Sequence, residues 1–233
     1  KLIVCNSDED PSKERAAIQV LLSRQVDGLI VASTGGALQE LSGALKAGVP
    51  VVLLDRFIRL PGADAVGIDN VAAAYQAVRH LLQLGHRRIG IILGPPHVYT
   101  SKTRLNGYIR ALREYGVEPD AALQWPGDFK EEGGYAGTKA LLALKEPPTA
   151  LFTTNNLTTT GALIALREAG VSIPAQMALV GFDDTPWARA IRPALTVVEQ
   201  PTYLLGTTAA QLLFARLNRR ETSPLGRTIQ LQA

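Results

Sequence analysis

The sequence is short of the residues that metal sites and disulfides need. Its 233 residues include a single cysteine, Cys5, and three histidines. One cysteine excludes an internal disulfide and a multi-cysteine metal site, and we interpret Cys5, within a strand pattern, as a small core residue. His80, His86 and His97 are not spaced as metal ligands are. We therefore predict no metal site and no cofactor.

Long apolar runs and a strong excess of one charge are also missing. No run reaches the ~18 apolar residues that a membrane helix needs, and no basic segment followed by an apolar one marks a secretory signal. The formal net charge is +3, and the lysines and arginines form no cluster dense enough for a nucleic-acid stripe. With 46% hydrophobic and 19% charged residues, the composition is that of an ordinary globular protein.

The usual sequence signatures of enzymes are absent as well. No GxGxxG or GxxxxGK(S/T) segment occurs, so nucleotide-cofactor chemistry lacks its usual signature. No Ser/His/Asp or Cys/His constellation is supported by its neighbouring residues. The sequence therefore predicts no catalytic residue, and we do not expect the chain to be an enzyme.

What the chain does contain is a regular alternation of strand and helix patterns. Apolar strand patterns occur at 2–5, 28–32, 51–54, 65–68, 88–93, 150–153, 177–182, 195–199 and 228–231. Helical patterns occur at 11–24, 38–47, 71–84, 101–115, 131–144, 157–169 and 203–218, with a turn at Pro224 before the last strand. This alternation predicts parallel sheets with helices on both faces. Because the strands are too many for one small sheet, we expect two lobes.

The signals that begin and end these helices are local. Asp10 as the N-cap, followed by Pro11, begins the first helix. A glycine follows four of the helices at the C′ position, namely Gly48, Gly85, Gly116 and Gly170. Asp183 and Asp184 directly follow the strand pattern at 177–182, where open α/β sheets bind their ligands. Taken alone, these two carboxylates are more simply explained as turn caps.

Several segments, in this order and spacing, carry a family resemblance. They include VDGLIV at 26–31, GVPVVLLDR at 48–56, LLQLGHRRIGIILGPP at 81–96, RLNGY at 104–108, GDFKEEGGY at 127–135, PPTALFTTNN at 147–156, LVGFDD at 179–184 and PALTVVEQP at 193–201. No single segment is diagnostic, but the set is specific and covers essentially the whole chain. It resembles the effector-binding core of lac-repressor and purine-repressor type (LacI/GalR) transcription regulators.

The resemblance implies two similar α/β lobes of the periplasmic-binding-protein type, with a ligand cleft between them and three crossing segments. One lobe would comprise 1–69 and 201–231, and the other 70–200. The crossings would fall at Asp69-Asn70, at Glu199-Gln200-Pro201 and near Leu231-Gln232. The resemblance further implies that the helix-turn-helix segment, the first core strand and helix, and the last core strand lie outside 1–233.

The same resemblance assigns ligand contacts in the second lobe. Asp183 would accept hydrogen bonds from vicinal sugar hydroxyls or a base N–H, and Arg104 would donate with its planar fork. Asn155 would contact the ligand, whereas Asn156 is interpreted as the N-cap of the next helix. Phe129 would stack on the ligand, or pack as a loop aromatic on its own lobe.

Further candidates are weaker. Thr100 matches a polar contact of purine-binding members, but Val98 replaces their arginine, which argues against a purine effector. Trp187 is a candidate for the cleft wall. In the first lobe, Asp55 ends a strand and would face the ligand, although it could form a local ion pair with its neighbour Arg56. Ser33, at the end of an earlier strand, is the last of these ligand-binding candidates.

The remaining candidates concern the hinge, the partners and the function. We interpret Asp69, Asn70, Gln200 and Pro201 as hinge residues. The resemblance implies a cytoplasmic homodimer that binds a small polar effector, most simply a sugar, and operator DNA through an N-terminal segment. A periplasmic sugar-binding protein shares the fold and is the alternative. The segments LGHRRIG, GDFKEEGGY and LVGFDD favour the regulator.

Overall fold

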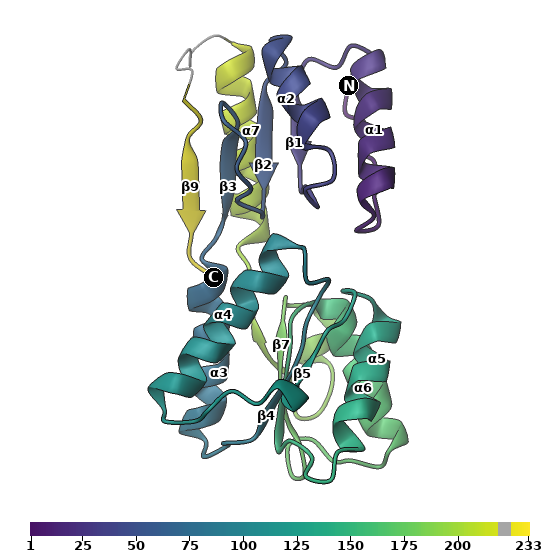
Figure 1. The fold of residues 1–233 in the computed structure, drawn as a ribbon, viewed down its shortest axis with the longest axis vertical. Helices are drawn as coiled ribbons and strands as arrows, with labels where there is room; N and C mark the ends of the chain where they lie inside the picture. The colour runs from purple at the N-terminus through teal and green to yellow at the C-terminus, as the bar shows by residue number, and fades with distance from the viewer. Residues whose placement is uncertain (219–224) are drawn as a thin grey trace. The chain divides into compact units, whose positions relative to one another are not determined.

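The structure is a computed structural model that describes residues 1–218 and 225–233, and it divides into two units (Figure 1). Unit 1 comprises Lys1–Ile68 with Pro201–Gln232, and unit 2 comprises Asp69–Gln200 with Ala233. The chain therefore passes from one unit to the other after residues 68, 200 and 232. The turn predicted at Pro224 lies outside the described residues.

Unit 1 contains one parallel sheet. Its strands are β1 (Leu29–Val31), β2 (Val51–Leu54), β3 (Asp64–Ile68) and β9 (Thr228–Leu231). They lie in the order β1-β2-β3-β9, and every neighbouring pair is parallel. The Val51–Leu54 and Thr228–Leu231 strands have the predicted bounds. Since parallel strands end at the same edge of a sheet, Ser33 and Asp55 follow strand ends on one edge.

Helices cover both faces of this sheet. They are α1 (Pro11–Ser23), α2 (Leu38–Lys46) and α7 (Thr202–Leu217). Figure 1 shows α2 in front of the strands and α7 behind them. Ile18, Leu41 and Leu53 are buried in the core that α1 and α2 form with the sheet. The predicted first helix is confirmed, because the carboxylate of Asp10 accepts hydrogen bonds from the backbone of its first turn.

The strand predicted at Leu2–Cys5 is wrong. These residues form no strand, and Leu2 and Val4 are 90% and 82% exposed. A strand requires a neighbour for its backbone hydrogen bonds, and none of the described strands pairs with this segment. The interpretation of Cys5 as a core residue fails for the same reason, since Cys5 is exposed.

Unit 2 contains a second parallel sheet. Its strands are β4 (Ile89–Ile92), β5 (Gln124–Trp125), β6 (Ala150–Thr153), β7 (Ala178–Phe182) and β8 (Thr196–Val198). They lie in the order β5-β4-β6-β7-β8, again with every pair parallel. Two short 3-10 helices interrupt the loops, η1 (Ala121–Leu123) and η2 (Pro186–Arg189). The η2 helix lies between the two aspartates that follow β7 and the start of β8.

Four helices cover this sheet in two pairs. They are α3 (Asn70–Gln83), α4 (Tyr99–Glu114), α5 (Glu131–Leu142) and α6 (Asn156–Glu168). Figure 1 shows α3 with α4 on one side of the strands and α5 with α6 on the other. The α5–α6 pair is very close, because a Cβ added at Gly161 would lie 2.0 Å from the carbonyl oxygen of Glu131. The predicted fold class, two parallel sheets flanked by helices, is confirmed.

Candidate functional site

Arg104 lies in α4 and is almost fully buried, with 3% of its surface exposed. Its Nε donates to Asn70 Oδ1 at 2.8 Å, and one terminal nitrogen donates to the backbone carbonyl of Thr154. The guanidinium also stacks on the ring of Phe182, with 3.6 Å between Cζ and the ring centroid, a favourable cation–π geometry. These contacts fix the plane of the Arg104 guanidinium group at the carboxyl ends of β6 and β7.

Asp183 directly follows Phe182 and therefore lies at the same strand end. Its Oδ1 accepts a hydrogen bond from Gln200 Nε2 at 2.6 Å, and its backbone N–H donates to the Val198 carbonyl at 2.9 Å. The neighbouring carboxylate of Asp184 instead pairs with Arg189 at 2.6 Å, and this hydrogen bond raises the pKa of Arg189. The two adjacent aspartates thus have different partners.

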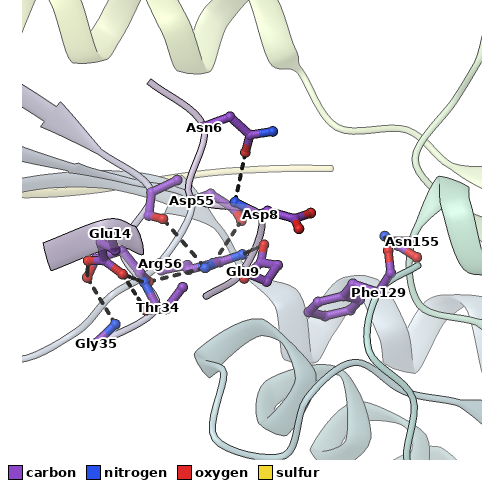
Figure 2. Close-up of polar contacts among 12 residues, drawn as sticks. Asn6, Asp8, Glu9, Glu14, Thr34, Gly35, Asp55, Arg56, Phe129 and Asn155 are labelled. Atoms are coloured by element: carbon purple, nitrogen blue, oxygen red, sulfur yellow. Dashed lines mark hydrogen bonds and ion pairs between the residues drawn. The ribbon is translucent and has the colours of Figure 1, made fainter. Parts of the chain in front are cut away.

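Asn155 and Phe129 form a second part of the site in unit 2, labelled in Figure 2. Asn155 Nδ2 donates to the carbonyl oxygen of Phe129 at 2.8 Å. The Phe129 ring is 6% exposed and packs on Gly94, where an added Cβ would lie 2.2 Å from its Cζ. The ring therefore packs on unit 2 itself, which agrees with the interpretation of Phe129 as a loop aromatic on its own lobe. Stacking of Phe129 on a ligand stays a prediction.

The prediction that Asn156 caps α6 is wrong. Asn155 is the N-cap: its Oδ1 accepts from the Thr158 N–H at 2.9 Å, and the Thr158 hydroxyl completes a capping box with the Asn155 backbone. Asn156 is the first helical residue. The two adjacent asparagines cap equally well, and what places Asn155 at the cap is its second bond, to the Phe129 carbonyl. Its amide oxygen is therefore committed to the helix.

In unit 1 the candidates belong to a charged cluster that Figure 2 shows at the ends of β1 and β2. Arg56 is 7% exposed and pairs with Glu9 at 2.5 Å, and it also donates to the Ser33 carbonyl at 3.3 Å. Asp55 lies 3.9 Å from Arg56 Nε. The local ion pair that the sequence left open is thus present, although Glu9 is the nearer carboxylate. Ligand binding by Asp55 stays a prediction.

Ser33 is held by a residue that sequence reasoning missed. Glu14, on α1, is 4% exposed and accepts from the Ser33 hydroxyl, the Thr34 hydroxyl and the Thr34 N–H, the last at 2.7 Å. A buried carboxylate is tolerated only when it is hydrogen-bonded in this way. The helical pattern gave no signal for Glu14, since a glutamate in a first turn is normally solvated. The Ser33 hydroxyl proton is thereby directed to Glu14.

The structure locates two further candidates, Thr100 and Trp187. Among the described residues, no hydrogen bond or ring contact given for them reaches another candidate. Thr100 is 2% exposed in the first turn of α4, and its carbonyl accepts from the Thr103 hydroxyl at 3.2 Å. Trp187 is half-buried in η2. Among the described residues, no group of three or more His, Cys, Asp or Glu could hold a metal ion.

Three of the eight ligand-binding candidates have positive φ angles: Asp55 at 67°, Phe129 at 64° and Asp183 at 74°. Asp tolerates this region better than most residues, but a bulky aromatic such as Phe is an outlier there. Such conformations persist where surrounding structure over-determines them, and they cluster at binding sites. This agrees with a site at the strand ends.

Comparison with known proteins shows which family this chain is related to. Residues 78–231 match the periplasmic binding protein-like domain. The chain is 33% identical over 223 residues to the HTH-type transcriptional repressor PurR of Edwardsiella ictaluri, covering 94% of this chain and 65% of that protein. A LacI family transcriptional regulator from Enterococcus faecium, solved with bound ribose, is 31% identical with a TM-score of 0.85, covering 99% of this chain and 83% of that one.

A third similar structure is the complex of the transcriptional regulator CelR with cellobiose, at 32% identity and a TM-score of 0.83. The matched region covers 94% of this chain and 68% of the CelR chain. The chain belongs to the LacI/GalR family, as its effector-binding core. It spans about 65% of the length of the PurR relative. Among the described residues of this LacI/GalR core, no helix combines the length and apolarity needed to cross a membrane.

Sequence reasoning missed how the residues of the LacI/GalR core support one another. Asn70 and Gln200 were predicted only as hinge residues, yet each bonds a charged candidate, Arg104 or Asp183. Asp69 caps α3 by accepting from the Ala72 N–H at 2.9 Å. The parallel register pairs Phe182 with Val198, which could have placed Gln200 beside Asp183 had the strand order been known.

Proposed function

We propose that this core senses a small, neutral polar effector, most simply a sugar, and that binding alters the affinity of a longer protein for operator DNA. The observation that carries the proposal is the Arg104–Asp183 arrangement of unit 2. A buried guanidinium and a carboxylate lie at one sheet edge, because Arg104 stacks on the ring of Phe182, the residue that directly precedes Asp183. Pockets of this kind use a few convergent polar groups to orient a ligand.

The charges of this arrangement support a neutral ligand. Arg104 contributes one positive charge and Asp183 one negative charge, and the second carboxylate, Asp184, is neutralised by Arg189. A hydroxyl can accept from the arginine and donate to the aspartate, whereas a phosphate would meet the Asp183 charge. The similar structures with bound ribose and with cellobiose support a sugar. The similarity to repressors supports regulation of transcription in the cytoplasm and gives no support to catalysis.

Calorimetry with D-ribose and cellobiose as probes tests this proposal. Replacing Asp183 by Ala should weaken the binding of a sugar that the wild-type chain binds by about 1–3 kcal/mol, because hydroxyls lose a charged acceptor. Asp184→Ala is the matched control, since its carboxylate pairs with an exposed arginine, and its affinity should stay that of the wild type. Equal affinities for Asp183→Ala and the wild type would remove Asp183 from the site.

We further propose that effector contacts come from both units and favour a closed arrangement, within the limit of the ligand's differential affinity. Closure would change the spacing of DNA-binding segments carried by the longer protein, and half-sites lie at fixed helical separations. Small-angle scattering with and without a bound sugar tests this. An unchanged radius of gyration at saturation would contradict closure.

A homodimer is part of the same proposal. Two-fold symmetric regulators match palindromic operators, and in unit 1 the apolar side chains of Val20 and Ile30 are 51% and 42% exposed. We expect the longer protein to be dimeric in light scattering at micromolar concentration. A monomeric mass would contradict this part without affecting the effector site.

A further inference from the structure

The first two passages of the chain between the units each lie next to a residue with a side-chain amide. Asn70 begins α3, one residue after the first passage, and is 2% exposed. Gln200 is the last residue of unit 2 before the second passage, and Pro201 follows it as the N-cap of α7. We call Asn70 and Gln200 the boundary amides. Both lie within unit 2, as do Arg104 and Asp183.

Each boundary amide bonds one of the two charged site residues. Asn70 Oδ1 accepts from Arg104 Nε at 2.8 Å, and Gln200 Nε2 donates to Asp183 Oδ1 at 2.6 Å. The two bonds have opposite polarity, as the charges require: an acceptor faces the guanidinium and a donor faces the carboxylate. Hydrogen bonds to charged groups are about twice as strong as neutral ones.

The Gln200 amide is held at one end only. Its Oε1 is buried and has no hydrogen-bond partner among the described residues. A buried unsatisfied acceptor is costly, and the bond to Asp183 is the hydrogen bond that the structure gives this side chain among the described residues. Removing Asp183 would therefore release the residue that adjoins the second passage.

We infer that Asn70 and Gln200 are positioning residues that couple the effector to the passages between the units. The inference rests on the proposed function, in which the effector binds Arg104 and Asp183. An effector that bonds these two groups competes with, or strengthens, the bonds that fix the boundary amides. Its affinity then depends on the conformation of both passages, and by thermodynamic reciprocity the passages respond to its binding.

The coupling is tested first without any ligand, by hydrogen exchange of backbone amides. Asp183→Ala should raise exchange at residues 199–203 by about tenfold or more, as expected for the loss of one charged hydrogen bond. Arg104→Met should do the same at 69–72. Asp184→Ala is the control, and its exchange at 199–203 should match the wild type.

Conservative variants separate positioning from a general loss of packing. Asp183→Asn keeps an acceptor for Gln200 Nε2 but loses the charge, so exchange at 199–203 should rise less than in Asp183→Ala. Asn70→Asp keeps an acceptor for Arg104 Nε and should retain wild-type exchange at 69–72, whereas Asn70→Ala and Gln200→Ala should raise exchange at their passages. The inference is overturned if Asp183→Ala and Arg104→Met leave both passages unchanged, or if the conservative and alanine variants behave alike.

Hydrogen exchange in the presence of a ligand then tests the proposed function separately. With a sugar that the wild-type chain binds in calorimetry, both passages should become more protected, and Gln200→Ala should lose the protection at 199–203 while still binding. The ligand-free arm decides the coupling by itself. Failure of the calorimetry on Asp183→Ala would therefore count against the effector site and not against the boundary amides.

Discussion

The two units bury different kinds of polar side chain. Unit 1 buries charges: Glu14, Arg56 and Asp64 are each less than 8% exposed. Unit 2 buries only one charged residue among the described residues, Arg104, and otherwise buries neutral polar groups, namely the amide of Asn70 and hydroxyls such as those of Thr153 and Thr159. Buried charges require partners, because an uncompensated one is strongly destabilising. Unit 1 should therefore be more sensitive to the loss of a single partner and to acid.

Asp64 is the clearest case in unit 1. Its fully buried side chain, on β3, accepts from Arg216 Nη2 at 2.8 Å and from the Arg227 N–H at 2.7 Å. These bonds tie β3 to the end of α7 and to the start of β9. The cluster holds together segments that are more than 150 residues apart in the sequence, as the separation of 152 residues between Asp64 and Arg216 shows.

Removing this carboxylate should have the largest effect. Asp64→Ala should cost about 3 kcal/mol of unfolding free energy, because it leaves a buried charge without its partner, and Asp64→Asn should cost less. Both tryptophans, Trp125 and Trp187, lie in unit 2. Urea unfolding followed by circular dichroism should therefore show the loss more strongly than tryptophan fluorescence. Equal shifts of both signals would mean that the units do not differ in the way described.

The close helix pair of unit 2 gives the next largest effect. Gly161→Ala should destabilise by about 2 kcal/mol, because its Cβ would overlap the backbone carbonyl of Glu131 and overpacking of this kind costs ~1–3 kcal/mol. Gly43, within α2 of unit 1, has no atom within 4 Å of an added Cβ. Gly43→Ala should therefore stabilise by up to about 1 kcal/mol through helix propensity. Thermal unfolding that shifts both variants in the same direction would contradict this contrast.

The same contrast explains what the sequence could predict. The Asp10 cap, the glycines that end helices and the strand at Ala150–Thr153 depend on local residue chemistry, and they were predicted with their positions. Leu2–Cys5 was not, because a strand depends on a neighbour. The Asn155 cap was misplaced by one residue, since its preference comes from a bond to Phe129 that only the folded chain provides.

Site residues divide in the same way. Asp183 and Arg104 could be predicted from the resemblance and from their place after a strand and in a helix's first turns. The contacts that orient them could not, because Asn70 is 34 residues from Arg104 and Gln200 is 17 from Asp183. Glu14 looked like a solvated helix residue. Its burial results from the loop at Ser33 and Thr34 folding onto α1.

Acid should weaken unit 1 only at low pH. Burial opposes the ionisation of Asp64, but the bonds from Arg216 and the Arg227 N–H outweigh it and lower the pKa of Asp64 below its ordinary value of 3.8. The folded state thus binds fewer protons than the unfolded state as pH falls. The stabilisation is fully present above the unfolded pKa and is lost as pH falls through the folded one. Between pH 5 and 3, the wild type should lose more stability than Asp64→Asn, measured by circular dichroism in urea.

Unit 2 should show the smallest effect, and at a higher pH. Burial lowers the pKa of His86 below its ordinary value of 6.5, and Nδ1 lies 2.9 Å from the Thr149 hydroxyl. The folded state therefore favours neutral His86, whereas the unfolded state takes up a proton near pH 6.5. Stability conferred by unit 2 should fall as pH drops from above 6.5 to below the lowered pKa, and then stay level.

Tryptophan fluorescence can isolate this change, since both tryptophans report on unit 2. The urea midpoint should decrease slightly between pH 7.5 and 5.5 in the wild type and remain constant in His86→Gln, which keeps a polar group opposite Thr149 without a titratable one. A midpoint that decreases equally in both proteins would assign the pH dependence to another group. A midpoint that rises on acidification in the wild type alone would show that His86 gains a carboxylate partner on protonation, which would reverse the assigned direction of its pKa.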